Sequence, residues 1–282
     1  MPVQKPRWRY ICKMNKVVTS LQNPLIKRFA SLTEKSRERS KTGLFTIEGV
    51  REAILARKAG CVLKTVLICP EIAGAEVVRK FERTENETFG RVKISTQIYK
   101  KLAYRSTTEG VLAIAEIKKL ELKDISFKTE NPLILVAEAT EKPGNIGALL
   151  RTADAAGVDA VLIANPKTDL YNPNTIRSSV GCIFTNQVAV GTTAAVIQFL
   201  KQRGCAIYCA APHAALPYHG QDFTRPSAIV VGAEATGLST DWLRNSSQNI
   251  TIPMQGEIDS VNVSVAAGIL IFEAKRQRGL KI

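Results

Sequence analysis

The segment Ile252-Pro-Met-Gln-Gly-Glu-Ile-Asp-Ser-Val-Asn-Val-Ser-Val-Ala-Ala267 decides how the chain is interpreted. Pro253 and Gly256 interrupt a strand and leave backbone N–H and C=O groups exposed, which suits recognition of an adenine edge. Ser260 and Asn262 come just before a helix of small residues, where they can orient a hydroxyl substrate or a cofactor. Taken alone, this Ser/Asn cluster also fits an ordinary capped helix.

A second segment, Val231-Gly-Ala-Glu-Ala-Thr-Gly-Leu-Ser239, follows an apolar stretch that is typical of a strand. Open α/β sheets bind ligands in loops at the carboxyl ends of their strands, which favours a site here. Glu234 is the lone acid of the loop, and Ser239 is predicted to cap the helix that follows. A simple turn explains the same glycines, so this loop also needs support from elsewhere.

A third segment, Lys142-Pro-Gly-Asn-Ile-Gly-Ala-Leu-Leu-Arg-Thr-Ala-Asp154, leaves a strand through a Pro-Gly turn. Asn145 is predicted to cap the next helix, and Gly147 permits close backbone approach. Arg151 falls about two turns into that helix, where a surface or salt-bridging role is equally open. The segment lacks a Walker A phosphate loop, and the dinucleotide-binding GxGxxG pattern is absent.

From Pro132 onward, apolar runs alternate with helical patterns, which predicts a mostly parallel sheet covered on both faces. The predicted strands are 133–137, 159–164, 183–190, 205–210 and 228–232, and the predicted helices are 145–156, 193–203 and 262–278. The preceding half also reads as a small α/β domain. It begins with a basic helical lead-in over residues 16–40, which includes Arg39, and continues with strands near 43–49, 64–69 and 110–116 and a helix over 50–59.

A chain of 282 residues suits two domains. We expect an extension over residues 1–14, a first domain over 15–117, a linker over 118–130 and a second domain over 131–282. The net charge of +14 is segregated, because residues 1–125 hold 26 Lys and Arg against 13 Asp and Glu. Such asymmetry favours a polyanion partner for the first domain, although a solvated basic surface is the simpler alternative.

Other features narrow the class of protein. The six cysteines form no CxxC pair and no zinc-type Cys/His spacing, so we expect reduced structural thiols and no metal. No apolar run approaches a membrane span, and the basic first residues lack a secretory core, so we expect a cytoplasmic protein. Met14 is a candidate natural start. His213 and His219 are expected in a surface loop.

Together the three segments read NxGxxxRTA, GxExxGLS and IPMxGxxxSxNVSVAA, and in this order they resemble the SpoU (TrmH-type) RNA ribose 2′-O-methyltransferases of the SPOUT superfamily. The resemblance covers residues from about 130 to the C-terminus. The stretch from Asn15 to Glu116 is more weakly similar to the L30e-like RNA-binding domain that often precedes such enzymes. Two departures are Val261 in place of leucine and Ala233 in place of asparagine.

The resemblance implies an α/β trefoil-knot (SPOUT) domain, a homodimer with its active site near the interface, and S-adenosylmethionine as cofactor. Carried onto this chain, it implies backbone or apolar contacts to the cofactor from Gly232, Ile252, Met254, Val261 and Ala266. It implies a catalytic and substrate-positioning set of Asn145, Arg151, Glu234, Ser260 and Asn262.

The implied reaction is in-line attack of a ribose 2′-oxygen on a sulfonium methyl group, which mainly requires positioning and deprotonation of the hydroxyl. Arg151 is the base that the resemblance implies, but an ordinary guanidinium stays protonated. Our hypothesis is that Arg151 binds the 3′-phosphate of the target nucleotide and thereby acidifies the hydroxyl. The separate basic domain favours 23S ribosomal RNA as substrate. The alternatives are a transfer RNA 2′-O-methyltransferase, a catalytically inactive RNA-binding or ribosome-assembly factor, and a nucleotide-dependent enzyme of doubly wound fold.

Overall fold

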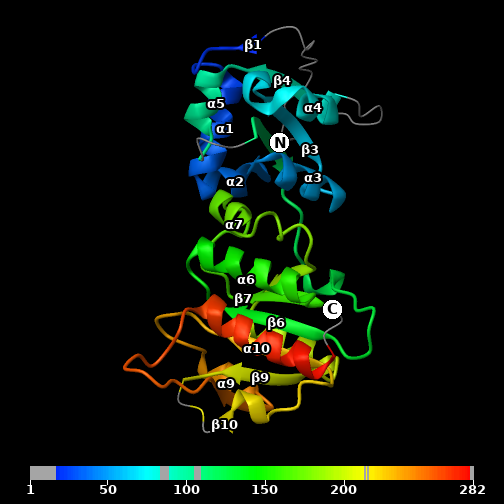
Figure 1. Ribbon diagram of the computed structural model, residues 1–282, viewed down its shortest axis with the longest axis vertical. Helices are drawn as coiled ribbons and strands as arrows, with labels where there is room; N and C mark the ends of the chain where they lie inside the picture. The colour runs from blue at the N-terminus through cyan, green and yellow to red at the C-terminus, as the bar shows by residue number, and fades with distance from the viewer. Residues whose placement is uncertain (1–16, 83–88, 105–108, 213, 215, 280–282) are drawn as a thin grey trace, which may run out of the picture. The chain divides into compact units, whose positions relative to one another are not determined.

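The structure, a computed structural model, describes residues 17–82, 89–104, 109–212, 214 and 216–279. The chain divides into two compact units, Met1–Ile117 and Lys118–Ile282, which are described separately (Figure 1). The predicted extension over residues 1–14, with Met14 and Cys12, lies outside the described residues, as does His213. Within the described part, no helix combines the length and the apolar character that crossing a membrane requires.

The first unit is an α/β domain built on a five-stranded mixed sheet of order β1-β4-β3-β5-β2. Strands β1, β4 and β3 are parallel, whereas β5 runs antiparallel to both β3 and β2. Apolar side chains of α1 and α5 pack on this sheet, with Ile26, Phe29 and Ile98 in its core. The elements are β1 (Val17–Val18), α1 (Pro24–Glu34), α2 (Ser36–Thr42), β2 (Leu44–Glu48), α3 (Val50–Lys58), β3 (Leu63–Ile68), α4 (Pro70–Glu82), β4 (Gly90–Ile94), α5 (Thr96–Leu102) and β5 (Val111–Glu116).

The basic lead-in that was predicted as one helical segment over 16–40 is instead a short strand followed by two helices. The break falls at Lys35, whose backbone is extended. Arg39, which the sequence placed among the basic residues, is only 1% exposed, and its Nη1 donates to the carbonyls of Leu32 and Thr33. This arginine joins α2 to the end of α1, and its charge is therefore not part of the exposed basic surface.

The second unit is built on a seven-stranded sheet of order β10-β12-β9-β11-β6-β7-β8, in which every strand pair is parallel. Its central strands β6, β7 and β11 are buried along their whole length, as continuous apolar runs require in a sheet covered on both faces. The elements are η1 (Leu122–Asp124), β6 (Leu133–Glu138), α6 (Pro143–Ala156), β7 (Ala160–Ala164), α7 (Pro173–Ser178), β8 (Val188–Gly191), α8 (Thr193–Gln202), β9 (Ala206–Ala210), β10 (Leu216–Pro217), η2 (Tyr218–Gly220), β11 (Ser227–Val231), α9 (Thr240–Asn245), β12 (Gln248–Thr251) and α10 (Val263–Gln277).

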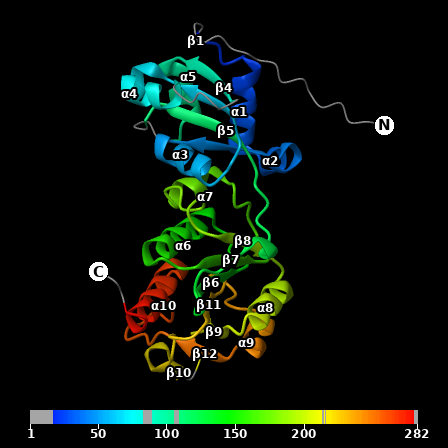
Figure 2. The same cartoon turned by 90° about the vertical axis from the view of Figure 1, so that its right-hand side faces the viewer.

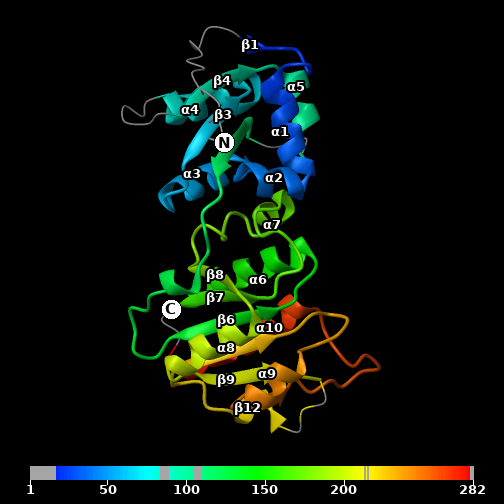
Figure 3. The same cartoon turned by 180° about the vertical axis from the view of Figure 1, so that it is seen from behind.

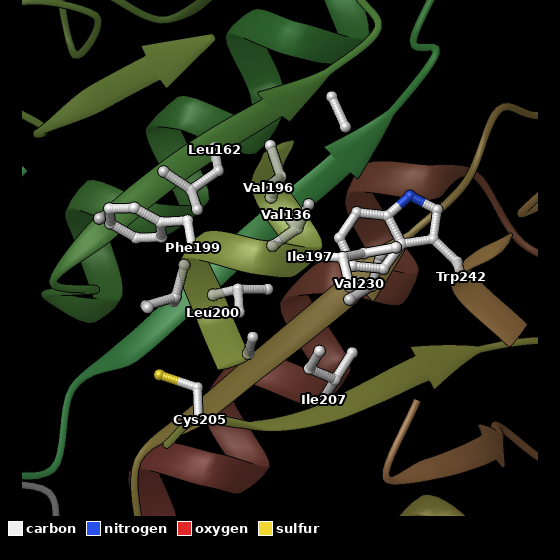
Figure 4. Close-up of a cluster of buried hydrophobic side chains, with 14 of the residues drawn as sticks. Val136, Leu162, Val196, Ile197, Phe199, Leu200, Cys205, Ile207, Val230 and Trp242 are labelled. Carbon is white, nitrogen blue, oxygen red and sulfur yellow. The ribbon is translucent and has the colours of Figure 1, made fainter. Parts of the chain in front are cut away.

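Helices cover both faces of this sheet. Seen edge-on, α6 and α10 lie on one side and α8 and α9 on the other (Figure 2), and the α8 and α9 side faces the viewer in Figure 3. The core under α8 and α9 includes Phe199 and Leu200 of α8, Trp242 of α9, and Val136 and Val230 of the central strands (Figure 4). The mostly parallel α/β sheet that the sequence predicts is therefore confirmed.

The strand predicted over 183–190 is wrong in its first half, because β8 begins only at Val188. Residues 179–186 form turns instead, with Val180 and Gly181 at positive φ. The Asn186 side chain donates to the carbonyls of Leu150 and Cys182, which fixes this turn against α6. Cys205 and Cys209, at either end of β9, are buried free thiols, and burial raises the pKa of both.

The end of α10 is tied to the start of the sheet by Arg278. Its guanidinium donates to the carbonyls of Phe223 (2.7 Å), Arg225 (2.6 Å), Asn131 and Pro132, so it joins the loop before β11 to the residues before β6. Burial is the main cause that lowers the pKa of Arg278. One planar donor group thus satisfies carbonyls from two loops.

We predict that Arg278→Ala lowers the free energy of unfolding by at least about 2 kcal/mol, because a single hydrogen bond from a charged donor contributes about that much and Arg278 donates four. Arg276→Ala is the matched control: Arg276 is exposed and, among the described residues, bonds to Glu273 of its own helix alone, so its loss should destabilise the chain much less. Urea unfolding followed by circular dichroism measures both. Equal losses of unfolding free energy in the two variants would contradict the stabilising role of the Arg278 hydrogen bonds.

Candidate active site

Three loops at the carboxyl edge of the second sheet bring together residues that are far apart in the sequence. Asn145 lies in the first turn of α6 after β6, Glu234 in the loop after β11, and Asn262 at the start of α10. The prediction that Asn145 caps α6 is wrong. The helix begins at Pro143 with Lys142 as its N-cap residue, because proline is favoured in the first helical position.

The carboxylate of Glu234 is the centre of this group. Its Oε1 accepts from the side-chain amides of Asn145 at 2.7 Å and Asn262 at 2.9 Å. Its Oε2 lies 2.8 Å from the ammonium of Lys142. A weaker bond of 3.4 Å joins the Asn262 amide to the Asn145 carbonyl oxygen. The structure therefore brings Asn145, Glu234 and Asn262 into one network.

Asn262 also caps its helix, as the ordinary interpretation of the Ser/Asn cluster predicts. Its Oδ1 accepts from the backbone N–H of Ser264 at 2.9 Å and from the Ser264 hydroxyl at 2.6 Å. With its oxygen held by the helix, its amide nitrogen is directed to Glu234. The cap thus sets the orientation of a network residue.

The charge of the network is fixed by Lys142. The hydrogen bond from its ammonium is the largest cause that holds the pKa of Glu234 below its usual range, and the Asn145 amide adds to it. The same contact raises the pKa of Lys142. The carboxylate therefore remains ionised at neutral pH and acts as an acceptor for the two amides.

The loop that carries Glu234 is tightly closed. Ala233 and Gly237 exchange two backbone hydrogen bonds, of 3.2 and 2.9 Å. A Cβ on Gly232 would lie 2.3 Å from the carbonyl carbon of Gly237, so glycine is required by this close approach. Gly237 has φ of 65°, a conformation that residues with a Cβ rarely adopt.

Sequence reasoning missed Glu138, the last residue of β6, which is 3% exposed. Its Oε1 accepts from the hydroxyls of Thr193 at 2.6 Å and Ser239 at 2.8 Å, and its Oε2 from the Ser239 N–H at 2.7 Å. Ser239 is the predicted N-cap residue of α9, but its hydroxyl bonds to Glu138 instead of to the helix. An acid at the end of an otherwise apolar strand was the signal that could have revealed this residue.

Ser260 and Arg151 do not join the network. Ser260 is exposed, and its hydroxyl bonds to Asp259. Arg151 is exposed on α6, about 9 Å along the helix from Asn145 and turned about 120° from it. It forms no ion pair or hydrogen bond with another described residue, so its guanidinium is available to a ligand.

The five residues predicted to contact a cofactor lie in or beside this edge. Gly232 follows β11, Ile252 and Met254 follow β12, and Val261 and Ala266 flank the start of α10; all five are half-buried. Within the part of the chain that the structure describes, the N–H groups of residues 254–261 donate to no backbone carbonyl. Apolar side chains next to unused backbone donors fit a nucleoside cofactor such as S-adenosylmethionine.

The remaining candidates for metal ligands are the histidines, cysteines and acids of the described residues. His219 is exposed in η2. Among the described residues, no three His, Cys, Asp or Glu side chains are placed to hold a metal ion together.

Comparisons with known proteins agree on one class. Residues 132–272 match the model of the SpoU rRNA methylase family, and residues 23–113 match an MRM3-like substrate-binding domain. The Bacillus subtilis 23S rRNA (guanosine(2553)-2′-O)-methyltransferase RlmP is 28% identical over 92% of this chain and 99% of its own.

Solved structures agree along both units. A crystal structure of an RNA 2′-O ribose methyltransferase, 37% identical, superimposes with a TM-score of 0.81 over 94% of this chain and 100% of that chain. An AdoMet-bound rRNA methyltransferase from Sinorhizobium meliloti, 28% identical, gives a TM-score of 0.82 over 93% of this chain and 97% of that chain.

The ion pair between Lys142 and Glu234 generates a prediction. In Lys142→Gln the pKa of the Glu234 carboxyl should rise towards its usual value, because the largest cause of its depression is removed. Titration of ¹³C-labelled glutamate side chains by NMR measures this value directly, with Lys128→Gln, a change at an exposed lysine outside the network, as control. An unchanged Glu234 titration in Lys142→Gln would contradict the contact.

Proposed function

The chain belongs to the SpoU rRNA methylase family, and we propose that it transfers a methyl group from S-adenosylmethionine to a ribose 2′-hydroxyl of 23S ribosomal RNA in the cytoplasm. The observation that carries this proposal is the network in which Glu234 accepts from both Asn145 and Asn262. Three motifs meet there, next to the edge that suits the cofactor, and the outermost pair, Asn145 and Asn262, is 117 residues apart in the sequence.

The proposed division of labour follows from the contacts. Gly232, Ile252, Met254, Val261 and Ala266 hold the cofactor through backbone groups and apolar contacts, and Asn145, Glu234, Ser260 and Asn262 position the ribose. When bound, S-adenosylmethionine supplies an electrophilic methyl group on a sulfonium. Because the sulfonium is a good leaving group, the chain mainly has to align the 2′-oxygen and favour its deprotonation.

Arg151 is proposed to bind the phosphate 3′ to the target ribose. Its side chain is exposed and pairs with no described carboxylate, so a phosphate does not have to compete with an internal partner. A guanidinium binds phosphate through two parallel hydrogen bonds, and the adjacent positive charge lowers the pKa of the ribose hydroxyl. This role does not require the arginine to lose a proton.

The first unit is proposed to hold the RNA. We assign residues 15–117 to this RNA-binding domain, 118–130 to the linker and 131–282 to the methyltransferase domain. The excess of basic residues before residue 126 and the match to a substrate-binding domain support this assignment. The relative RlmP, which is named as a 23S rRNA methyltransferase and matches over nearly its full length, favours 23S ribosomal RNA over transfer RNA as the substrate.

A homodimer is also proposed, with α10 in its interface. Val265 is 50% exposed and Phe272 42% exposed, and a spacing of seven residues puts them on one face of this helix. Ile258, in the loop before α10, is 66% exposed. We further propose that the segment before α10 is knotted as the resemblance implies, which a crystal structure tracing this segment tests.

The experiment that tests the function is transfer of a tritiated methyl group from S-adenosylmethionine to unmodified 23S ribosomal RNA, with transfer RNA as comparison and nucleoside analysis as readout. We expect one 2′-O-methylated nucleoside from 23S ribosomal RNA. Arg151→Ala should lower kcat/KM by about 100-fold or more, the scale typical for loss of one charge-stabilising group. Arg244→Ala, at an exposed arginine of α9, is the control.

Absence of methyl transfer to any RNA would contradict the function. Near-normal turnover in Arg151→Ala would contradict the role of this arginine alone.

For the homodimer, sedimentation velocity at micromolar concentration should give twice the chain mass of 30.8 kDa. Phe272→Glu should give the monomer, because a charge would be buried at an apolar contact. A wild-type chain that sediments as a monomer would rule the dimer out.

A further inference from the structure

A pocket of about 580 Å³ lies at the carboxyl ends of β6, β7 and β11 and has no role in the function proposed above. Three segments line it: the end of β6, the loop after β7 and the far half of the loop that carries Glu234. The lining residues are Glu138, Ala139, Asn165, Pro166, Lys167, Thr236, Gly237 and Ser239. Its volume is in the range of pockets that bind small molecules.

The polar side chains of Glu138 and Asn165 in the pocket lining already have hydrogen-bond partners. The Glu138 carboxylate already accepts three hydrogen bonds from Thr193 and Ser239. The Asn165 amide donates to the Thr193 hydroxyl at 2.9 Å. Ala139 and Asn165 both have positive φ, 49° and 47°, at the ends of adjacent strands. A conformation that is costly for alanine persists only where the surroundings hold it, and such residues cluster at functional sites.

The lining of the pocket includes one exposed cation. Lys167 is exposed and forms no ion pair with any described carboxylate. Because Glu138 is only 3% exposed and its oxygens already accept three hydrogen bonds, the charged group that the pocket lining presents to solvent is the ammonium of Lys167. Thr236 is exposed beside it and adds a hydroxyl. An anion with hydrogen-bond acceptors is the ligand that these groups suit.

The pocket shares one loop with the candidate active site. Glu234 reaches Asn145 of α6 and Asn262 of α10, whereas Thr236 and Gly237, two and three residues later, line the pocket. The bonds between Ala233 and Gly237 hold both halves of the loop in one rigid turn. Of the proposed cofactor contacts, Gly232 begins this loop and lies close to Gly237 of the pocket lining, whereas Ile252 and Met254 follow β12. The pocket therefore lies beside the ribose site, and none of the five proposed cofactor contacts lines it.

We propose that this pocket takes a nucleotide of the substrate RNA that flanks the methylated one, with its phosphate on Lys167. The proposal rests on the proposed function and deepens it, because it assigns a second contact that fixes the register of the RNA strand at the active site. An RNA strand whose target ribose lies at the Glu234 network continues over the shared loop into this pocket. Its backbone supplies the anion that the exposed ammonium lacks.

The test compares Lys167→Glu with Lys128→Glu, the same charge reversal at an exposed lysine outside the pocket. The probe is unmodified 23S ribosomal RNA transcribed in vitro, bound to the full chain on filters without cofactor and then methylated with it. We expect Lys167→Glu to raise the RNA Kd and KM by about 10-fold or more, and Lys167→Ala to reduce the salt dependence by about one phosphate contact. The Kd for S-adenosylmethionine, measured by calorimetry, should not change.

A second measurement identifies the phosphate. Once the methylated nucleotide is known, short RNAs carrying a single methylphosphonate, which has no charge, are prepared at each flanking position. At one position, the neutral linkage should remove the difference in KM between wild type and Lys167→Ala.

The outcomes separate the two proposals. No methyl transfer by the wild-type chain would overturn the proposed function. The filter-binding comparison would still test whether the pocket binds RNA, because it needs no methyl transfer. Equal RNA affinities for Lys167→Glu and Lys128→Glu, or a KM difference that survives every methylphosphonate, would overturn the pocket as a nucleotide site.

Discussion

The arrangement of the second unit depends on one carboxylate that joins three distant segments. Glu234 binds the amides of Asn145 and Asn262 and the ammonium of Lys142, so the starts of α6 and α10 are fixed relative to the loop after β11. None of these partners is buried, and each contact is modest alone. Their value is geometric, because together they orient side chains that a reaction needs aligned.

A second carboxylate holds the far end of the same loop. Glu138 ends a fully buried strand and holds Ser239 and Thr193, the first residues associated with α9 and α8. The eight residues from Gly232 to Ser239 are thus held near each end by an acid, one exposed and one buried. A parallel sheet makes this possible, since all of its strands deliver their loops to one edge.

The sequence predicted most of this architecture, because β6, β7 and β11 are continuous apolar runs and the three motifs are specific. It could not predict contacts that depend on long-range packing. Lys142 rather than Asn145 caps α6 because proline sets the helix start, and Arg39 is buried by a break at Lys35 that periodicity does not reveal. Residues 183–187 look like strand but are held in a turn by Asn186. The role of Glu138 could not be predicted from the sequence, because its partners Thr193 and Ser239 lie 55 and 101 residues away.

Asn145 and Asn262 are expected to act as one unit through Glu234. A double-mutant cycle on single-turnover methyl transfer, with Asn145→Ala, Asn262→Ala and the pair, tests it most directly. We predict strong non-additivity: once either amide is lost the carboxylate is no longer fixed, so the second change should cost little more. Additive losses would mean that the two asparagines act independently and would contradict the account.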